Sequence, residues 1–132
     1  MEIFDAYHQT VLAIGVMAAL LLSQLIIADV VGIKAKHKPG MPVNADHGNL
    51  LFRASRVVGN ANDSVAVFIL AVAFCILSGA SPVYTAYAAW TYVILRILYA
   101  VCYYANVQTM RSAIFGISLV SLLALIGIGF FT

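Results

Sequence analysis

Apolar residues form four long runs along this chain, and shorter polar segments separate them. The runs cover residues 7–33, 49–77, 83–105 and 111–131. Each run is long enough to cross the roughly 30 Å of a bilayer's hydrocarbon as a helix. The short connections between the later runs make consecutive helices antiparallel neighbours. The pattern therefore predicts an all-α membrane protein in which residues 1–132 form a single domain, a bundle of four antiparallel transmembrane helices.

Composition excludes an ordinary soluble domain. The 132 residues are 64% hydrophobic and only 9% charged, which leaves too few polar side chains to cover a soluble surface. The small net charge of +2 gives no sign of nucleic-acid binding. Cys75 and Cys102 have no spacing typical of a zinc site, so we expect no metal. Their predicted places near opposite membrane faces also argue against a disulfide.

Positive charges set the expected orientation. Lys34, Lys36 and Lys38 lie in the long first loop, and Arg111 begins the fourth run on the same side of the membrane. The first residues are acidic, and the turn at 78–82 is uncharged. By the positive-inside rule, the first loop faces the cytoplasm and the N-terminus faces away from it.

Polar side chains interrupt the second and third runs at helical spacing. The two sets are Arg56, Asn60 and Asp63 in the second run, and Arg96, Tyr99 and Tyr103 in the third. A helix advances about 100° per residue, so the members of each set share one face. Lipid penalises charge heavily, so such residues line a protein interior or a polar cavity.

Matching depths in antiparallel helices place Asp63 beside Arg96 near the middle of the bilayer. We expect the two charges to neutralise each other, although the pair also fits a purely architectural role. The side chains left to line a pocket open to the cytoplasm are Arg56, Asn60, Tyr99 and Tyr103. Arg111 lies at the edge of this pocket. Cations and hydroxyls suit a small anion with several carboxylates, and they would lower the pKa of a bound thiol.

Other polar residues have ordinary explanations. We expect Arg53 to extend to the lipid headgroups and His47 to be solvated. Tyr84 and Tyr104 fit the aromatic belt at the membrane interface, and this belt is also the alternative interpretation of Tyr99 and Tyr103.

The polar residues of the second run resemble a signature of the MAPEG family, membrane-associated proteins in eicosanoid and glutathione metabolism. Residues 56–63, Arg-Val-Val-Gly-Asn-Ala-Asn-Asp, are similar to the family's Arg-x-x-x-Asn-x-x-Glu motif, with Asp63 in place of the glutamate. The Gly-Asn-Ala core is similar to small bacterial members. Residues 96–103 resemble a second family motif, and Arg111-Ser112 resembles the arginine and serine that open the fourth helix. The resemblance covers essentially the whole chain.

This resemblance implies a homotrimer of four-helix bundles, located in the bacterial inner membrane. It also implies glutathione as co-substrate, held between neighbouring subunits near the cytoplasmic face. The residues implied to hold glutathione or shape its site are Arg56, Asn60, Asp63, Arg96, Tyr99 and Tyr103. Arg111 is implied to stabilise the glutathione thiolate, with Ser112 assisting. A lysine of the first loop stands loosely where members have arginines.

Two functions remain open at this point. The favoured hypothesis is a glutathione-dependent transferase or peroxidase, an enzyme that acts on an apolar electrophile arriving from the lipid. The alternative is a non-catalytic membrane binding or scaffold protein, which the altered surroundings of Asp63 favour. A transporter fits less well, because the runs lack the glycine and proline interruptions typical of transporter ion sites.

Overall fold

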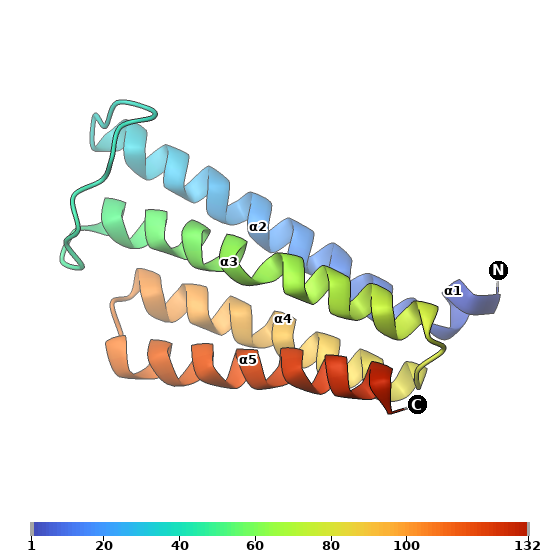
Figure 1. Ribbon diagram of the computed structural model, residues 1–132. Helices are drawn as coiled ribbons and strands as arrows, with labels where there is room; N and C mark the ends of the chain where they lie inside the picture. The colour runs from blue at the N-terminus through green and yellow to red at the C-terminus, as the bar shows by residue number, and fades with distance from the viewer. Residues whose placement is uncertain (1, 132) are drawn as a thin grey trace.

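The computed structural model describes residues 2–131, which form an elongated helical bundle (Figure 1). A short helix, α1 (Glu2–Ala6), precedes the four long ones and has no counterpart among the predicted runs. The long helices are α2 (His8–Lys34), α3 (Leu50–Leu77), α4 (Pro82–Tyr104) and α5 (Gln108–Phe130). All four are long and apolar enough to cross a membrane. The predicted all-α architecture, with four long apolar helices that could cross a membrane, is therefore confirmed.

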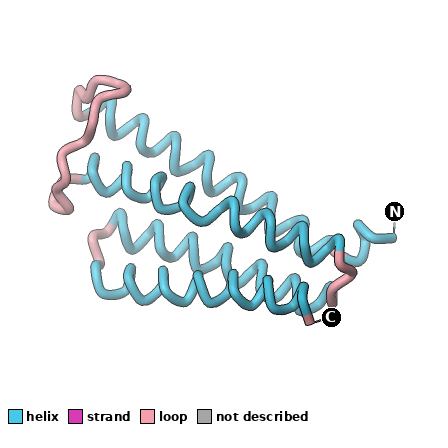
Figure 2. Tube along the Cα trace, viewed as in Figure 1, coloured by secondary structure: helices cyan, strands magenta, loops and turns pink. Residues whose placement is uncertain are grey.

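The connections alternate between the two ends of the bundle. The α2–α3 loop and the α4–α5 turn lie at one end, which we call the loop end, and the α3–α4 turn and both termini lie at the other (Figures 1 and 2). Helix α4 packs against α2, α3 and α5. Helix α3 likewise packs against α2, α4 and α5, so both of these helices turn one face toward the interior of the bundle.

Local chemistry explains where α3 and α4 begin. The side chain of Asn49 accepts a hydrogen bond from the backbone N–H of Leu51 at 2.9 Å, which caps α3. The Ser81 hydroxyl accepts from the backbone N–H of Tyr84 at 3.4 Å. Pro82 follows as the first residue of α4, where its fixed φ suits a helix and its missing N–H costs nothing.

Helix α5 begins three residues earlier than the sequence predicts. Asn106 takes a positive φ of 60° and turns the chain, and Val107 is extended. Gln108 is the first helical residue, and the backbone N–H of Arg111 already donates to the Val107 carbonyl at 3.1 Å. Arg111 therefore lies just inside the helix, where it is still close to the positive end of the helix dipole.

The core is apolar but contains a few hydroxyl contacts. The rings of Phe68 and Tyr92 stack with centroids 4.5 Å apart, and the hydroxyls of Ser64 and Tyr92 hydrogen-bond at 2.7 Å. The Cys75 thiol donates to the Leu125 carbonyl at 3.1 Å, and both cysteines are free thiols. These contacts join α3 to α4 and α5 well away from the loop end.

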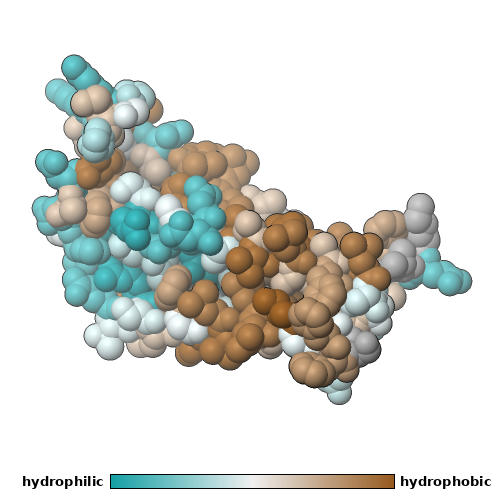
Figure 3. Space-filling model, in the orientation of Figure 1, coloured by the Kyte–Doolittle hydropathy of each residue, from teal (hydrophilic) through white to brown (hydrophobic). Residues whose placement is uncertain are grey.

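The surface divides by hydropathy along the long axis. On the face shown in Figure 3, hydrophilic residues gather toward the loop end and hydrophobic residues cover most of the rest. Many large apolar side chains are exposed there, which suits lipid and not water.

Candidate functional site

Four of the predicted site residues line one cavity between α3, α4 and α5. The cavity has a volume of about 170 Å³, and its lining residues are Asn60, Tyr99, Arg111, Ser112 and Phe115. Phe115 was not among the predicted residues, since an aromatic residue in an apolar run gives no signal of its own. The cavity combines a cation, two hydroxyls and an amide with one aromatic wall.

Arg111 is positioned by an aromatic ring. Its guanidinium carbon lies 4.3 Å from the centre of the Tyr103 ring, within the range of a cation–π contact. The Nη1 atom of Arg111 is buried and has no hydrogen-bond partner among residues 2–131. The contact with Tyr103 thus restrains the guanidinium, and one of its nitrogens is left without a hydrogen-bond partner among the described residues.

Arg96 lies behind the cavity wall and is almost fully buried, with 1% of its surface exposed. Its guanidinium carbon lies 4.4 Å from the centre of the Tyr99 ring and 5.9 Å from that of Phe115. None of its three guanidinium nitrogens has a hydrogen-bond partner in the described part of the chain. Arg96 is therefore stabilised by aromatic faces and not by a carboxylate.

The expected contact between Asp63 and Arg96 is not formed within one chain. Asp63 is exposed, whereas the next residue, Ser64, is buried and hydrogen-bonded to Tyr92 on α4. One residue is a rotation of about 100°, so turning Ser64 toward α4 turns Asp63 away from it.

The predicted stripe on α3 runs along the outer side of the helix. Arg56 is exposed like Asp63, and Asn60 is half-buried and donates its amide hydrogen to the Arg56 carbonyl at 3.0 Å. Only Asn60 of these three lines the cavity.

The two tyrosines of α4 that the sequence assigned to the site are interior residues. Tyr99 and Tyr103 are each only 4% exposed, and their ring centroids lie 5.7 Å apart. The belt interpretation is therefore wrong for these two. It is also wrong for Tyr104, whose hydroxyl is buried, whereas Tyr84 is 63% exposed as a belt residue should be.

Arg53 and His47, near the start of α3, make contacts within the bundle that the sequence did not predict. Arg53 donates from Nη1 to the His47 carbonyl at 2.7 Å and from Nε to the Tyr104 carbonyl at 3.3 Å, so it does not extend to the headgroups. His47 is half-buried, and its Nε2 lies 3.0 Å from the Tyr103 hydroxyl. The only sequence signal for His47 was its place just before a long helix.

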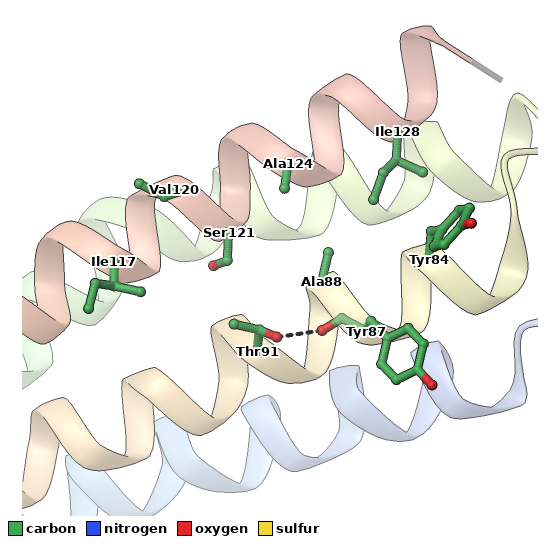
Figure 4. A pocket seen from close by; sticks show the side chains of 9 residues that line it. All are labelled: Tyr84, Tyr87, Ala88, Thr91, Ile117, Val120, Ser121, Ala124 and Ile128. Atoms are coloured by element: carbon green, nitrogen blue, oxygen red, sulfur yellow. Dashed lines mark hydrogen bonds between the residues drawn. The ribbon is translucent and has the colours of Figure 1, made fainter.

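A larger hollow of about 450 Å³ lies between α4 and α5 toward the other end of the bundle (Figure 4). Its lining residues are Tyr84, Tyr87, Ala88, Thr91, Ile117, Val120, Ser121, Ala124 and Ile128, all uncharged. The Thr91 hydroxyl is already used, since it donates to the Tyr87 carbonyl at 2.7 Å. Phe115 and Ile117 are two residues apart and so point to nearly opposite sides of α5. This groove is therefore separate from the cationic cavity, and its chemistry suits an alkyl chain.

The fold and the cavity define an integral, multi-pass α-helical membrane protein with a cationic site near one end of the bundle. The chain belongs to the MAPEG family: the MAPEG family model matches residues 10–131. Searches among curated proteins and among solved structures gave no significant match. Family membership supports a membrane role related to glutathione or to eicosanoid metabolism.

Proposed function

We propose that this protein binds glutathione at the cavity of Asn60, Tyr99, Arg111 and Ser112 and joins it through its sulfur to an apolar electrophile. The observation that carries the proposal is the buried Nη1 of Arg111, a charged donor without a partner among the described residues, beside a cavity with hydroxyl groups. A thiolate near this guanidinium would receive a charge-assisted hydrogen bond. The same cation lowers the pKa of the bound thiol and so favours its reactive form.

In the transferase form of this reaction, the thiolate sulfur attacks an electrophilic carbon. A carbon–sulfur bond forms. In a substitution, the displaced group leaves with its bonding electrons; in an addition to a double bond, the displaced electron pair takes up a proton. In the peroxidase form, the thiolate attacks an oxygen of a hydroperoxide, the O–O bond breaks, and the alcohol leaves with a proton while the sulfur becomes a sulfenic acid. A second glutathione then attacks that sulfur, which forms glutathione disulfide and releases water. Holding both reactants at the membrane supplies proximity, the main contribution this site has to make.

We also propose that copies of the chain associate, as a homotrimer, to complete the site. Arg56 and Asp63 are exposed on a membrane-crossing helix, where lipid contact is costly. The cavity of about 170 Å³ is smaller than the 300 Å³ or more that is typical of ligand pockets. A neighbouring copy would cover the polar side of α3 and enlarge the cavity.

In the proposed orientation, the loop end, with Lys34, Lys36 and Lys38, faces the cytoplasm of a bacterial inner membrane.

The test uses detergent-purified protein titrated with glutathione, followed by ultraviolet difference absorbance of the thiolate and by calorimetry. Arg111→Ala should abolish the thiolate absorbance, whereas Thr109→Ala, an exposed position of the same helical turn, should leave it intact. A conjugation assay with a generic electrophile then measures turnover. Thiolate absorbance that persists unchanged in Arg111→Ala refutes the role given to Arg111.

A non-catalytic binding or scaffold protein is the second candidate. It is favoured by Asp63, which stands where the family motif has a glutamate and is exposed on α3. On this alternative, the polar groups only specify how the bundle packs. Absence of binding heat at millimolar glutathione would select it.

A further inference from the structure

The segment just before α3 places a histidine against the back of the site. His47 Nε2 lies 3.0 Å from the Tyr103 hydroxyl, and the two rings are stacked with centroids 5.8 Å apart and planes inclined by 29°. The ring of Phe52 meets His47 edge-on at 5.0 Å. His47 is thus held between an aromatic ring of α3 and one of α4.

The backbone around His47 is tied down on both sides. Arg53 binds the His47 carbonyl at 2.7 Å and the Tyr104 carbonyl at 3.3 Å, which joins the segment to the end of α4. The Asp46 side chain accepts from the backbone N–H of Gly48 at 2.9 Å, which closes a tight turn. The position of the imidazole is therefore set by the fold and not by a free loop.

Tyr103 connects this histidine to Arg111. Its hydroxyl is engaged by His47, and its ring lies 4.3 Å from the Arg111 guanidinium carbon. Side chains from the loop, α4 and α5 thus form one continuous series of contacts. His47 and Tyr99 both contact the Tyr103 ring, and the guanidinium of Arg111 lies over that same ring.

We propose that His47 is a positioning residue, which holds Tyr103 and through it the Arg111 guanidinium in the orientation that thiolate binding requires. The proposal rests on the proposed function for its ligand. His47 does not line the cavity, so its loss leaves the other glutathione contacts in place. Without His47, the Tyr103 ring loses its hydroxyl partner and one stacking neighbour, and the direction of the Arg111 guanidinium becomes less restricted.

The experiment compares His47→Ala, His47→Gln and Tyr103→Phe with a matched control, His37→Ala. His37 is also a half-buried loop histidine, but its Nε2 lies 2.9 Å from the Met41 carbonyl within the same loop. His47→Gln keeps a hydrogen-bonding group, and Tyr103→Phe keeps the ring while removing the hydroxyl.

The first readout needs no glutathione. In arginine-labelled protein, the Nε–H resonance of Arg111 reports its stacking on the Tyr103 ring, and Arg53, Arg56 and Arg96 are the other arginines of the chain. His47→Ala and Tyr103→Phe should move this resonance toward that of an unstacked arginine. His47→Gln should largely restore it, and His37→Ala should not move it.

The second readout adds glutathione. His47→Ala should lower the thiolate absorbance at saturation about fivefold, the size expected from losing one hydrogen bond, while the calorimetric Kd changes less than about twofold. A wild-type protein without thiolate absorbance refutes the proposed function, and the Arg111 resonance then still tests the contact series. An Arg111 resonance that is unchanged in both His47→Ala and Tyr103→Phe overturns the positioning proposal. So does equal loss of absorbance in His37→Ala and His47→Ala.

Discussion

The Arg96 guanidinium carbon lies 4.4 Å from the centre of the Tyr99 ring. The sequence had predicted the carboxylate of Asp63 as the partner of this guanidinium. An aromatic face attracts a cation by about 0.5–2 kcal/mol, which is much less than the cost of burying the charge. Arg96 is therefore retained at an energetic cost to the bundle of one chain. Association with a neighbour or binding of an anion would reduce that cost.

Replacing Arg96 with an uncharged residue of similar length tests whether the cost of burying its charge exceeds the attraction of the aromatic rings. We expect Arg96→Met to unfold at the same or a higher temperature than the wild type, because it removes a buried charge and keeps most of the volume. Arg96→Ala should be less stable by about 2–4 kcal/mol, since it leaves a cavity. Thermal unfolding in detergent gives both values. If the Met variant is as unstable as the Ala variant, Arg96 has a charge partner in the assembled protein.

The hydrogen bond between the hydroxyls of Ser64 and Tyr92, at 2.7 Å, should contribute to the stability of the fold. Tyr92→Phe should destabilise the protein by about 1–2 kcal/mol, because it leaves the buried Ser64 hydroxyl without its partner. Ser64→Ala should cost a similar amount, and the double variant should cost less than the two summed. Tyr87→Phe, at a position that is 70% exposed, serves as the control. Additive effects in the double variant would show that the two hydroxyls do not interact.

Glycine at position 129 is required by close packing. A Cβ atom added there would lie 2.6 Å from two carbons of the Phe74 ring, so that ring would have to shift. We expect Gly129→Ala to lower the free energy of unfolding by about 1–3 kcal/mol. Gly127→Ala adds the same atom two residues away, where nothing lies within 4 Å, and should cause no loss. Equal stability of the two variants would argue against close contact between α3 and α5 at this level.

The proposed orientation, in which the lysines of the first loop face the cytoplasm, is testable by labelling. In a variant whose native cysteines are replaced, Lys38→Cys should react with an impermeant thiol reagent only from the cytoplasmic side. Ser78→Cys, in the exposed turn at the opposite end, should react only from the other side. Inside-out and right-side-out vesicles separate the two cases. Labelling of both positions from the same side would contradict the antiparallel four-helix topology.

The sequence predicted the helices better than it predicted side-chain partners. Helix α3 is Leu50–Leu77 against a predicted 49–77, because hydropathy and the Asn49 cap act locally. The start of α5 was missed by three residues, since Gln108 and Thr109 are polar yet helical. Asp63 and Arg96 were matched by depth alone. Depth does not say which way a side chain points.

Hydropathy and charge along the chain determined by themselves that this is a membrane protein with four long helices, and its motifs indicated the family. These features depend on composition and local spacing, which a linear sequence contains in full. Only the tertiary structure decided that Tyr103 joins His47 to Arg111, and that Arg96 packs on Tyr99. Such contacts depend on how each helix is rotated about its axis. That rotation is set by packing among residues far apart in the chain, such as Ser64 with Tyr92.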